Sequence, residues 1–283
     1  MKKSLFILSL AFVSLFANAQ VTTPQPSPAG SVSTVVGLTD VKIDYSRPRA
    51  KGRKIFGTDA AVVVPFGKIW RTGANSGTII TFSDTVTVEG ITVPNGKYLL
   101  LTWPGATEWT IALNKDINLG GNTGGYDAAK DAANFKVKSD KLTEKVETFT
   151  ISIGDISDDS KNAKVQLSWE NTSVKFNIGV NYEAKVMKSI KTSTTVSSNN
   201  YFSAAVYYLE NGKDLNQALT WINEAVKANP NAFWMLHQKA KIQKALGDKA
   251  GAKATATASL ESAKKAENRD YQMMNEDLIK SLK

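Results

Sequence analysis

Arginine is concentrated in one short part of this 283-residue chain. Four of the five arginines lie within 25 residues: Arg47, Arg49, Arg53 and Arg71. The thirty lysines, in contrast, are spread along the whole sequence. A planar guanidinium group can hold a carboxylate or phosphate through two parallel hydrogen bonds and can stack on an aromatic ring, which a lysine ammonium group does poorly. We therefore expect this segment to form either an anion-binding site or a specific buried network.

Aromatic and amide side chains accompany the arginines and complete a candidate binding site. Arg47, Arg53 and Arg71 would hold an anion, and Tyr45 or Trp70 would stack on it. The candidate set comprises Tyr45, Arg47, Lys51, Arg53, Trp70, Arg71 and Asn75. In the alternative interpretation, the arginines pair with Asp44 and Asp59 and hold long loops against the domain. Buried Arg–carboxylate networks also favour arginine, so the sequence leaves both interpretations open.

The rest of the inventory offers little chemistry. The chain has no cysteine and a single histidine, His237, which excludes a thiol nucleophile, disulfides, thiolate metal sites and a histidine-dependent triad in the N-terminal part. Residues 114–118 (NKDIN) begin like a calcium-binding loop, but Leu119 and Gly125 occupy the positions of the required glycine and glutamate. Spacing singles out no pair among the 26 acidic residues. We therefore predict no catalytic residue, no metal site and no cofactor.

The N-terminus has the pattern of an export signal. Lys2 and Lys3 precede an apolar run from Leu5 to Phe16, and residues 17–19 (ANA) form a small-x-small cleavage site. The sequence predicts a cleaved signal peptide over 1–19, a flexible Pro- and Thr-rich leader over 20–30, and a periplasmic or secreted protein. The apolar run is too short to span a bilayer, and we expect no transmembrane segment.

The positive charge coincides with the arginine segment. The chain carries a formal charge of +9, and the stretch from Lys42 to Arg71 contains eight basic residues against two acidic ones. For an exported protein this positive charge favours acidic polymers, lipid head groups or small anions as partners. We expect no nucleic acid partner. A solvated basic loop would give the same pattern.

Hydrophobic periodicity divides the chain into two domains. From 31 to 180 apolar residues alternate with period two, which predicts an all-β antiparallel sandwich with turns at 94–96 and 170–173. A bridging helix and a polar linker follow over 181–200. Residues 201–283 show helical periodicity, giving an α+β multidomain fold whose second part is a small all-α domain of helical hairpins.

Alanine spacing in this helical part resembles tetratricopeptide repeats. Ala218 and Ala252 lie 34 residues apart, and Ala218, Ala225 and Pro230 match the small and proline positions of that repeat. The second copy is degenerate. About two hairpins and a capping helix are too few for a long groove, so we expect this domain either to pack on the sandwich or to bind a protein partner weakly.

Four motifs resemble a known family. They are residues 45–48 (YSRP), 51–57 (KGRKIFG), 70–75 (WRTGAN) and 94–98 (PNGKY). These match the pattern of the family known as domain of unknown function 2911, over roughly 28–178, and the tail over 200–282 is similar to the helical tails its members often carry. The resemblance implies an exported bacterial β-sandwich protein and no known activity.

Three functional hypotheses follow. The first is a non-enzymatic exported binding protein that recognises an anionic or polar ligand, such as a saccharide, through the Arg/Trp loops. The second is an envelope hydrolase that uses carboxylates to cleave sugars. The third is a structural or assembly protein whose arginines are internal staples.

Overall fold

The computed structural model describes residues 23–193 and 197–282. These form two compact units, one ending at Asn181 and one beginning at Tyr182. The expected signal peptide, residues 1–19, lies outside the described residues, as do residues 20–22 of the leader and 194–196 of the linker. In the described ranges, no helix combines the length and the apolar character needed to cross a membrane.

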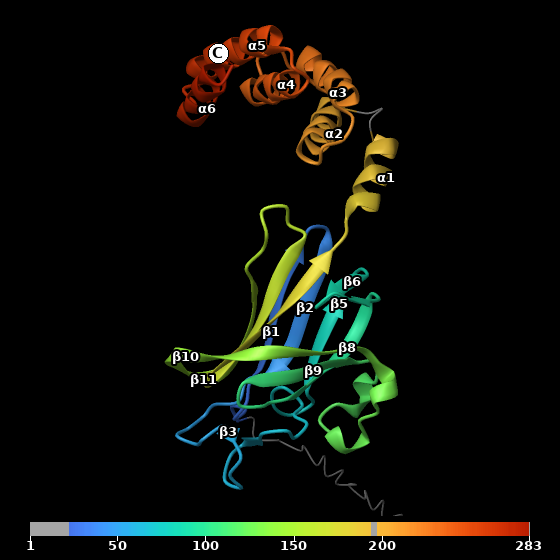
Figure 1. Ribbon diagram of the computed structural model, residues 1–283, viewed down its shortest axis with the longest axis vertical. Helices are drawn as coiled ribbons and strands as arrows, with labels where there is room; N and C mark the ends of the chain where they lie inside the picture. The colour runs from blue at the N-terminus through green and yellow to red at the C-terminus, as the bar shows by residue number, and fades with distance from the viewer. Residues whose placement is uncertain (1–22, 194–196, 283) are drawn as a thin grey trace, which may run out of the picture. The chain divides into compact units, whose positions relative to one another are not determined.

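The N-terminal unit is built on one antiparallel sheet of nine strands (Figure 1). Across the sheet these are β1 (Ala29–Val36), β2 (Thr39–Ser46), β5 (Thr78–Phe82), β8 (Gly96–Trp103), β9 (Glu108–Asn114), β10 (Asp131–Gly154), β11 (Asn162–Val180), β6 (Val86–Val88) and β7 (Ile91–Val93). Two short strands, β3 (Phe56–Gly57) and β4 (Val64–Pro65), pair in parallel apart from it. The predicted all-β antiparallel domain is confirmed.

Strand β10 joins the two halves of this sheet. Its first part pairs with β9, and from Ser139 onward it pairs with β11. The sheet thereby folds back on itself, and β2 lies against the second part of β10. The Tyr45 hydroxyl donates to the Ile151 carbonyl oxygen (3.4 Å) and accepts from the Ile151 amide (3.1 Å), while its ring meets Phe149 edge-on at 5.8 Å. One side chain thus satisfies both backbone groups of a buried residue in the opposite layer.

The prediction of a hairpin turn at 170–173 is wrong, because β11 runs unbroken from Asn162 to Val180. Odd-numbered residues such as Val165 and Leu167 are buried before this point, and even-numbered residues such as Phe176 and Ile178 after it. Glu170 has φ 53°, and the pairing with β10 changes register beside it. A β-bulge inserts one residue and reverses the alternation, so it leaves the same phase shift in the sequence as a tight turn.

A smaller apolar cluster lies on the outer face of the sheet. Leu99, Leu101 and Ala112 are fully buried there, although this face would be wet if nothing covered it. The connection from Lys115 to Lys130, with the 3₁₀ turns η1 (Ile117–Leu119), η2 (Thr123–Gly125) and η3 (Ala128–Lys130), packs Leu119 and Tyr126 against them.

The C-terminal unit is entirely helical. Its helices are α1 (Glu183–Ser193), α2 (Ser198–Glu210), α3 (Leu215–Ala228), α4 (Phe233–Ala245), α5 (Lys249–Lys265) and α6 (Arg269–Lys280). Gly212 (φ 61°) and Gly247 (φ 84°) stand at the left-handed positions after α2 and α4, where a side chain would be strained. This confirms the predicted helical domain.

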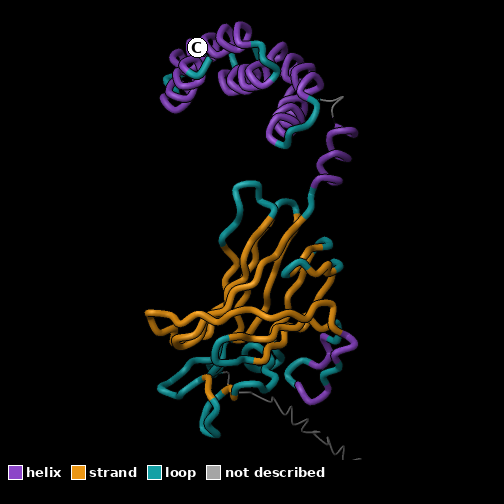
Figure 2. The backbone as a smooth tube through the Cα atoms, in the orientation of Figure 1, coloured by secondary structure: helices purple, strands orange, loops and turns teal. Residues whose placement is uncertain are grey.

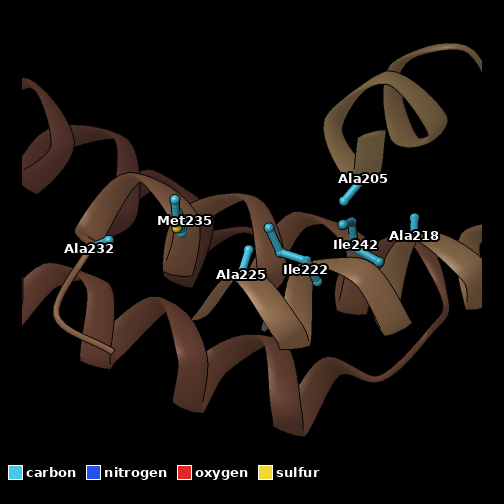
Figure 3. Close-up of a cluster of buried hydrophobic side chains, with 7 residues drawn as sticks. All are labelled: Ala205, Ala218, Ile222, Ala225, Ala232, Met235 and Ile242. Atoms are coloured by element: carbon cyan, nitrogen blue, oxygen red, sulfur yellow. The ribbon is translucent and has the colours of Figure 1, made fainter. Parts of the chain in front are cut away.

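Small residues let these helices approach closely. Figure 3 shows one buried cluster between α2, α3 and α4, formed by Ala205, Ala218, Ile222, Ala225, Ala232, Met235 and Ile242. Ala252 and Ala256 are buried in the next hairpin in the same way. The alanines that set the repeat spacing are therefore packing residues.

His237 is also an interhelix residue. Asn275 on α6 donates its amide hydrogens to the Ser259 hydroxyl (2.8 Å) and the Tyr271 carbonyl (2.7 Å), so its oxygen faces His237 Nδ1 at 2.8 Å. Nδ1 must then carry the proton of a neutral ring. Burial lowers the pKa of His237, and the hydrogen bond to Asn275 opposes this only in part.

We expect Tyr45→Phe to lower the free energy of unfolding by about 1–3 kcal/mol, because both backbone groups of Ile151 lose a buried partner. Tyr45→Leu also loses the edge contact to Phe149 and should lower it further. Urea denaturation of the full chain, followed by tryptophan fluorescence, measures both changes. Wild-type stability of Tyr45→Phe would show that the hydroxyl contributes nothing.

Acidification should destabilise the helical unit. The unfolded chain binds the proton of His237 more readily than the folded one, so stability is lost as the pH falls below about 6.5. Urea unfolding followed by circular dichroism at about pH 7.5 and about pH 5.5 should show this loss, and His237→Asn should reduce the pH dependence. An equal pH dependence in the variant would contradict the prediction.

Candidate functional site

The arginine loops rest on a cluster of buried aromatic rings. Trp70 stacks on Trp169 of β11 with ring centroids 5.8 Å apart and planes at 19°. Phe149 lies 5.1 Å and Phe56 5.9 Å from Trp70, both edge-on. Trp70 is 8% and Trp169 2% exposed. Figure 2 shows the loops of this region gathered at the end of the β unit that carries β3 and β4. The cluster gives them a rigid apolar floor.

The motif at 70–75 folds into a tight loop on this floor. The Trp70 indole donates to the Gly73 carbonyl (3.0 Å), and its backbone pairs with Thr102 of β8. Thr72 has φ 56° and Gly73 φ 146°, conformations that reverse the chain within two residues. The Thr72 hydroxyl shares a hydrogen bond with that of Thr102 (3.1 Å), and the Thr78 hydroxyl donates to the Thr72 carbonyl. These bonds fix the backbone that carries Arg71 and Asn75.

Arg71 is held by main-chain oxygen. Its Nη1 donates to the Asn75 carbonyl (3.0 Å), while Asn75, at φ 56°, donates its amide to the Ser27 carbonyl (3.2 Å) and the Ser46 hydroxyl (3.1 Å). The guanidinium group lies against Gly121, where a Cβ would collide with the Asn75 carbonyl and come within 2.5 Å of Nη1. Only glycine at 121 lets the 115–130 connection close over this side of Arg71.

Arg53 caps its own turn. Its Nε donates to the Ala50 carbonyl (3.1 Å) and its Nη2 to the Arg49 carbonyl (2.7 Å). The side chain is otherwise exposed, and Nη1 bonds to no described residue. Two guanidinium groups are thus positioned by backbone oxygens, and each keeps N–H groups for another acceptor.

An open depression of about 330 Å³ lies between these groups. Its lining consists of Ser27, Pro48, Arg53, Val63, Val64, Trp70, Arg71, Gly73, Ala74, Asn75 and Trp169. Four of the seven candidate residues therefore meet at one place, namely Arg53, Trp70, Arg71 and Asn75. The only charged residues in the lining are Arg53 and Arg71.

Three candidates lie outside this lining. Tyr45 is buried and its hydroxyl is used by Ile151. The exposed Lys51 side chain stands on a left-handed residue (φ 48°) whose amide donates to Glu147 Oε1 at 2.7 Å. The stem of Arg47 lies over Gly30, where a Cβ would come within 2.8 Å of its Cδ. Its buried Nε has no hydrogen-bond partner among the described residues.

The acids expected to staple the arginines are bonded to lysines. Asp44 pairs with Lys42 (2.9 Å) and Asp59 with Lys54 (2.6 Å). The hydrogen bond from Lys54 holds the pKa of Asp59 below its usual range. In the described ranges, no ion pair joins Arg53 or Arg71 to an acid. The arginines do secure loops, but through carbonyl oxygens.

Sequence reasoning missed Trp169 and Gly121. Trp169 stands at the end of an alternating run, and nothing local to it signals a partner a hundred residues away. Gly121 belongs to a glycine-rich stretch with no distinguishing motif. The calcium-like segment at 114–118 is also structural, because Asn114 is buried and donates to Asp131 Oδ1 (2.8 Å) and the Asp127 carbonyl (3.0 Å).

A family model described as Protein of unknown function (DUF2911) matches residues 27–178, which contain all the motifs that line this depression. The chain belongs to this family. The DUF2911 match spans every strand of the N-terminal sheet apart from the last two residues of β11, and the helical unit lies beyond it. No curated protein and no solved structure shows significant similarity to the chain.

Gly121→Ala should destabilise the β unit by about 1–3 kcal/mol, because the added methyl group must displace Arg71 or the Asn75 backbone. Gly154→Ala is the matched control, since a Cβ there has no atom within 4 Å. Thermal unfolding of both variants measures the difference. Equal melting temperatures would mean that the 115–130 connection moves away at no cost.

Proposed function

We propose that this DUF2911 protein is an exported, non-enzymatic binding protein whose arginine depression holds a small anionic ligand. The observation that carries the proposal is that the lining of this depression contains two guanidinium groups and no acidic side chain. A carboxylate or phosphate would supply the acceptors that Arg53 and Arg71 lack.

The surroundings favour anion binding on three grounds. Arg53 and Arg71 are held by carbonyl oxygens before a ligand arrives, so little side-chain freedom is lost on binding. The Trp70 and Trp169 floor excludes water on one side, which strengthens charge–charge attraction above it. A volume of about 330 Å³ suits a single sugar acid or phosphorylated group.

Hydrolysis by a carboxylate pair has less support. No carboxylate lines the arginine depression. Of two other depressions in the β unit, one has a single carboxylate in its lining, that of Glu108, and the other has none. Glycoside hydrolysis needs two carboxyl groups about 5–10 Å apart across the bond to be cleaved. Binding therefore accounts for the site better than catalysis.

Location and partners complete the proposal. The signal pattern of residues 1–19 supports a periplasmic or secreted protein. The helical unit would contact another protein, since it exposes apolar side chains at Trp234, Met273 and Met274.

Removing the two guanidinium groups should abolish anion binding. Calorimetric titration of the full chain with glucuronate and with inorganic phosphate distinguishes a carboxylate from a phosphate ligand. Arg53→Gln and Arg71→Gln should each weaken binding about tenfold or more, because each removes charge-assisted hydrogen bonds. Arg49→Gln is the matched control, as Arg49 is exposed in the same segment and does not line the depression.

Two outcomes would contradict the proposal. The first is a wild-type protein that binds neither probe. The second is binding that Arg49→Gln weakens as much as the other two variants, which would indicate general attraction to a basic surface.

A further inference from the structure

A second depression, of about 430 Å³, opens on the outer face of the β unit. It is lined by Gly67, Trp103, Pro104, Gly105, Glu108, Thr110 and Asn134. None of these residues lines the arginine depression. The function proposed above therefore makes no use of this site.

Three neighbouring strands present its central side chains on one face. Trp103 of β8 stands directly opposite Thr110 of β9. Asn134 of β10 stands opposite Ala112, two residues along from Thr110. Residues paired across an antiparallel sheet point to the same side, as do residues two apart on one strand. An indole, a hydroxyl and an amide are thus held by the rigid sheet.

Tyr126 fixes the orientation of the Trp103 ring. The two rings meet edge-on, with centroids 5.0 Å apart and planes at 66°. The Tyr126 hydroxyl donates to Asp131 Oδ2 (2.7 Å), and the Asn134 amide donates to the same oxygen (3.0 Å). Burial, and then the contact with Asp131, raises the pKa of Tyr126 to about 12, so this donor stays protonated at neutral pH. The Asp131 carboxylate therefore positions both Tyr126, which contacts Trp103, and Asn134.

Several hydrogen-bonding groups around the Trp103 ring are available to a ligand. The Thr110 hydroxyl, the Asn134 amide oxygen and the Trp103 indole N–H make no hydrogen bond to any described residue. Glu108, the one acid in the lining, forms an ion pair with Lys136 (2.9 Å). At Gly105 a Cβ would collide with the Glu108 carbonyl, so the turn beside the ring has to lack a side chain.

We propose that this depression binds a neutral pyranose unit of a glycan, stacked on Trp103 and hydrogen-bonded by Thr110 and Asn134. A sugar ring has an apolar C–H face and a rim of hydroxyl groups. The face matches the electron-rich surface of an indole, and the rim matches donors and acceptors set around it. The lining offers no basic side chain to an anionic ligand, and its one acid, Glu108, already forms an ion pair with Lys136.

The test is calorimetric titration of the full chain with maltotetraose, cellotetraose and tetra-N-acetylchitotetraose. We expect the wild type to bind at least one of these neutral probes. Trp103→Leu should weaken that binding about tenfold or more, and Thr110→Val combined with Asn134→Ala should do the same. Trp234→Leu, which removes an exposed tryptophan of the helical unit, should leave it unchanged.

The double variant protects the test from loss of the Trp103–Tyr126 contact. Where Trp103→Leu unfolds, the variant at Thr110 and Asn134 decides, because Asn134 is exposed and Thr110 is half-buried. Arg53→Gln and Arg71→Gln should bind neutral probes like the wild type, which separates this site from the anion site. Wild-type protein that binds none of the three probes, or binding that survives both sets of substitutions, would overturn the proposal.

Discussion

The aromatic contact between the two layers of the folded sheet is the interaction on which the rest of the β unit depends. Trp70, Trp169 and Phe149 come from a loop, from β11 and from β10, and their rings lie 5.1–5.8 Å apart. Burial of such large side chains is the main favourable term at this end of the domain. Because Trp70 is anchored here, the following loop must reverse at Thr72 and Gly73, and Arg71 is carried to the surface beside the cluster. The position of the Arg71 guanidinium group is thus a consequence of how the aromatic cluster packs.

In the two proposals, the depressions would recognise their ligands by opposite means. In the first, cationic groups stand over a hidden aromatic floor, and the ring edges contribute mainly by excluding water. In the second, the aromatic ring itself is accessible, and the charged residue next to it is paired. A polymer with both acidic and neutral sugars contains one group suited to each surface.

The sequence was informative wherever a signal is local. Alternation located the strands, helical periodicity and alanine spacing located the helical hairpins, and the arginine–tryptophan motifs supplied four residues of one depression. It failed where the signal is ambiguous or distant. The phase shift at Glu170 fits a turn and a bulge equally well, and only pairing with β10 decides between them. Tyr45 looked like a stacking residue because a sequence cannot show that its hydroxyl meets Ile151, 106 positions away.

Backbone anchoring of the arginines has a consequence for acid tolerance. A guanidinium group held by a carboxylate loses its partner when that acid is protonated, and its position then becomes less defined. Carbonyl oxygens do not titrate, and arginine keeps its charge throughout the accessible range. Arg53 and Arg71 rest on the carbonyls of residues 49, 50 and 75. The geometry of this depression should therefore persist in surroundings acidic enough to disable a site built from ion pairs.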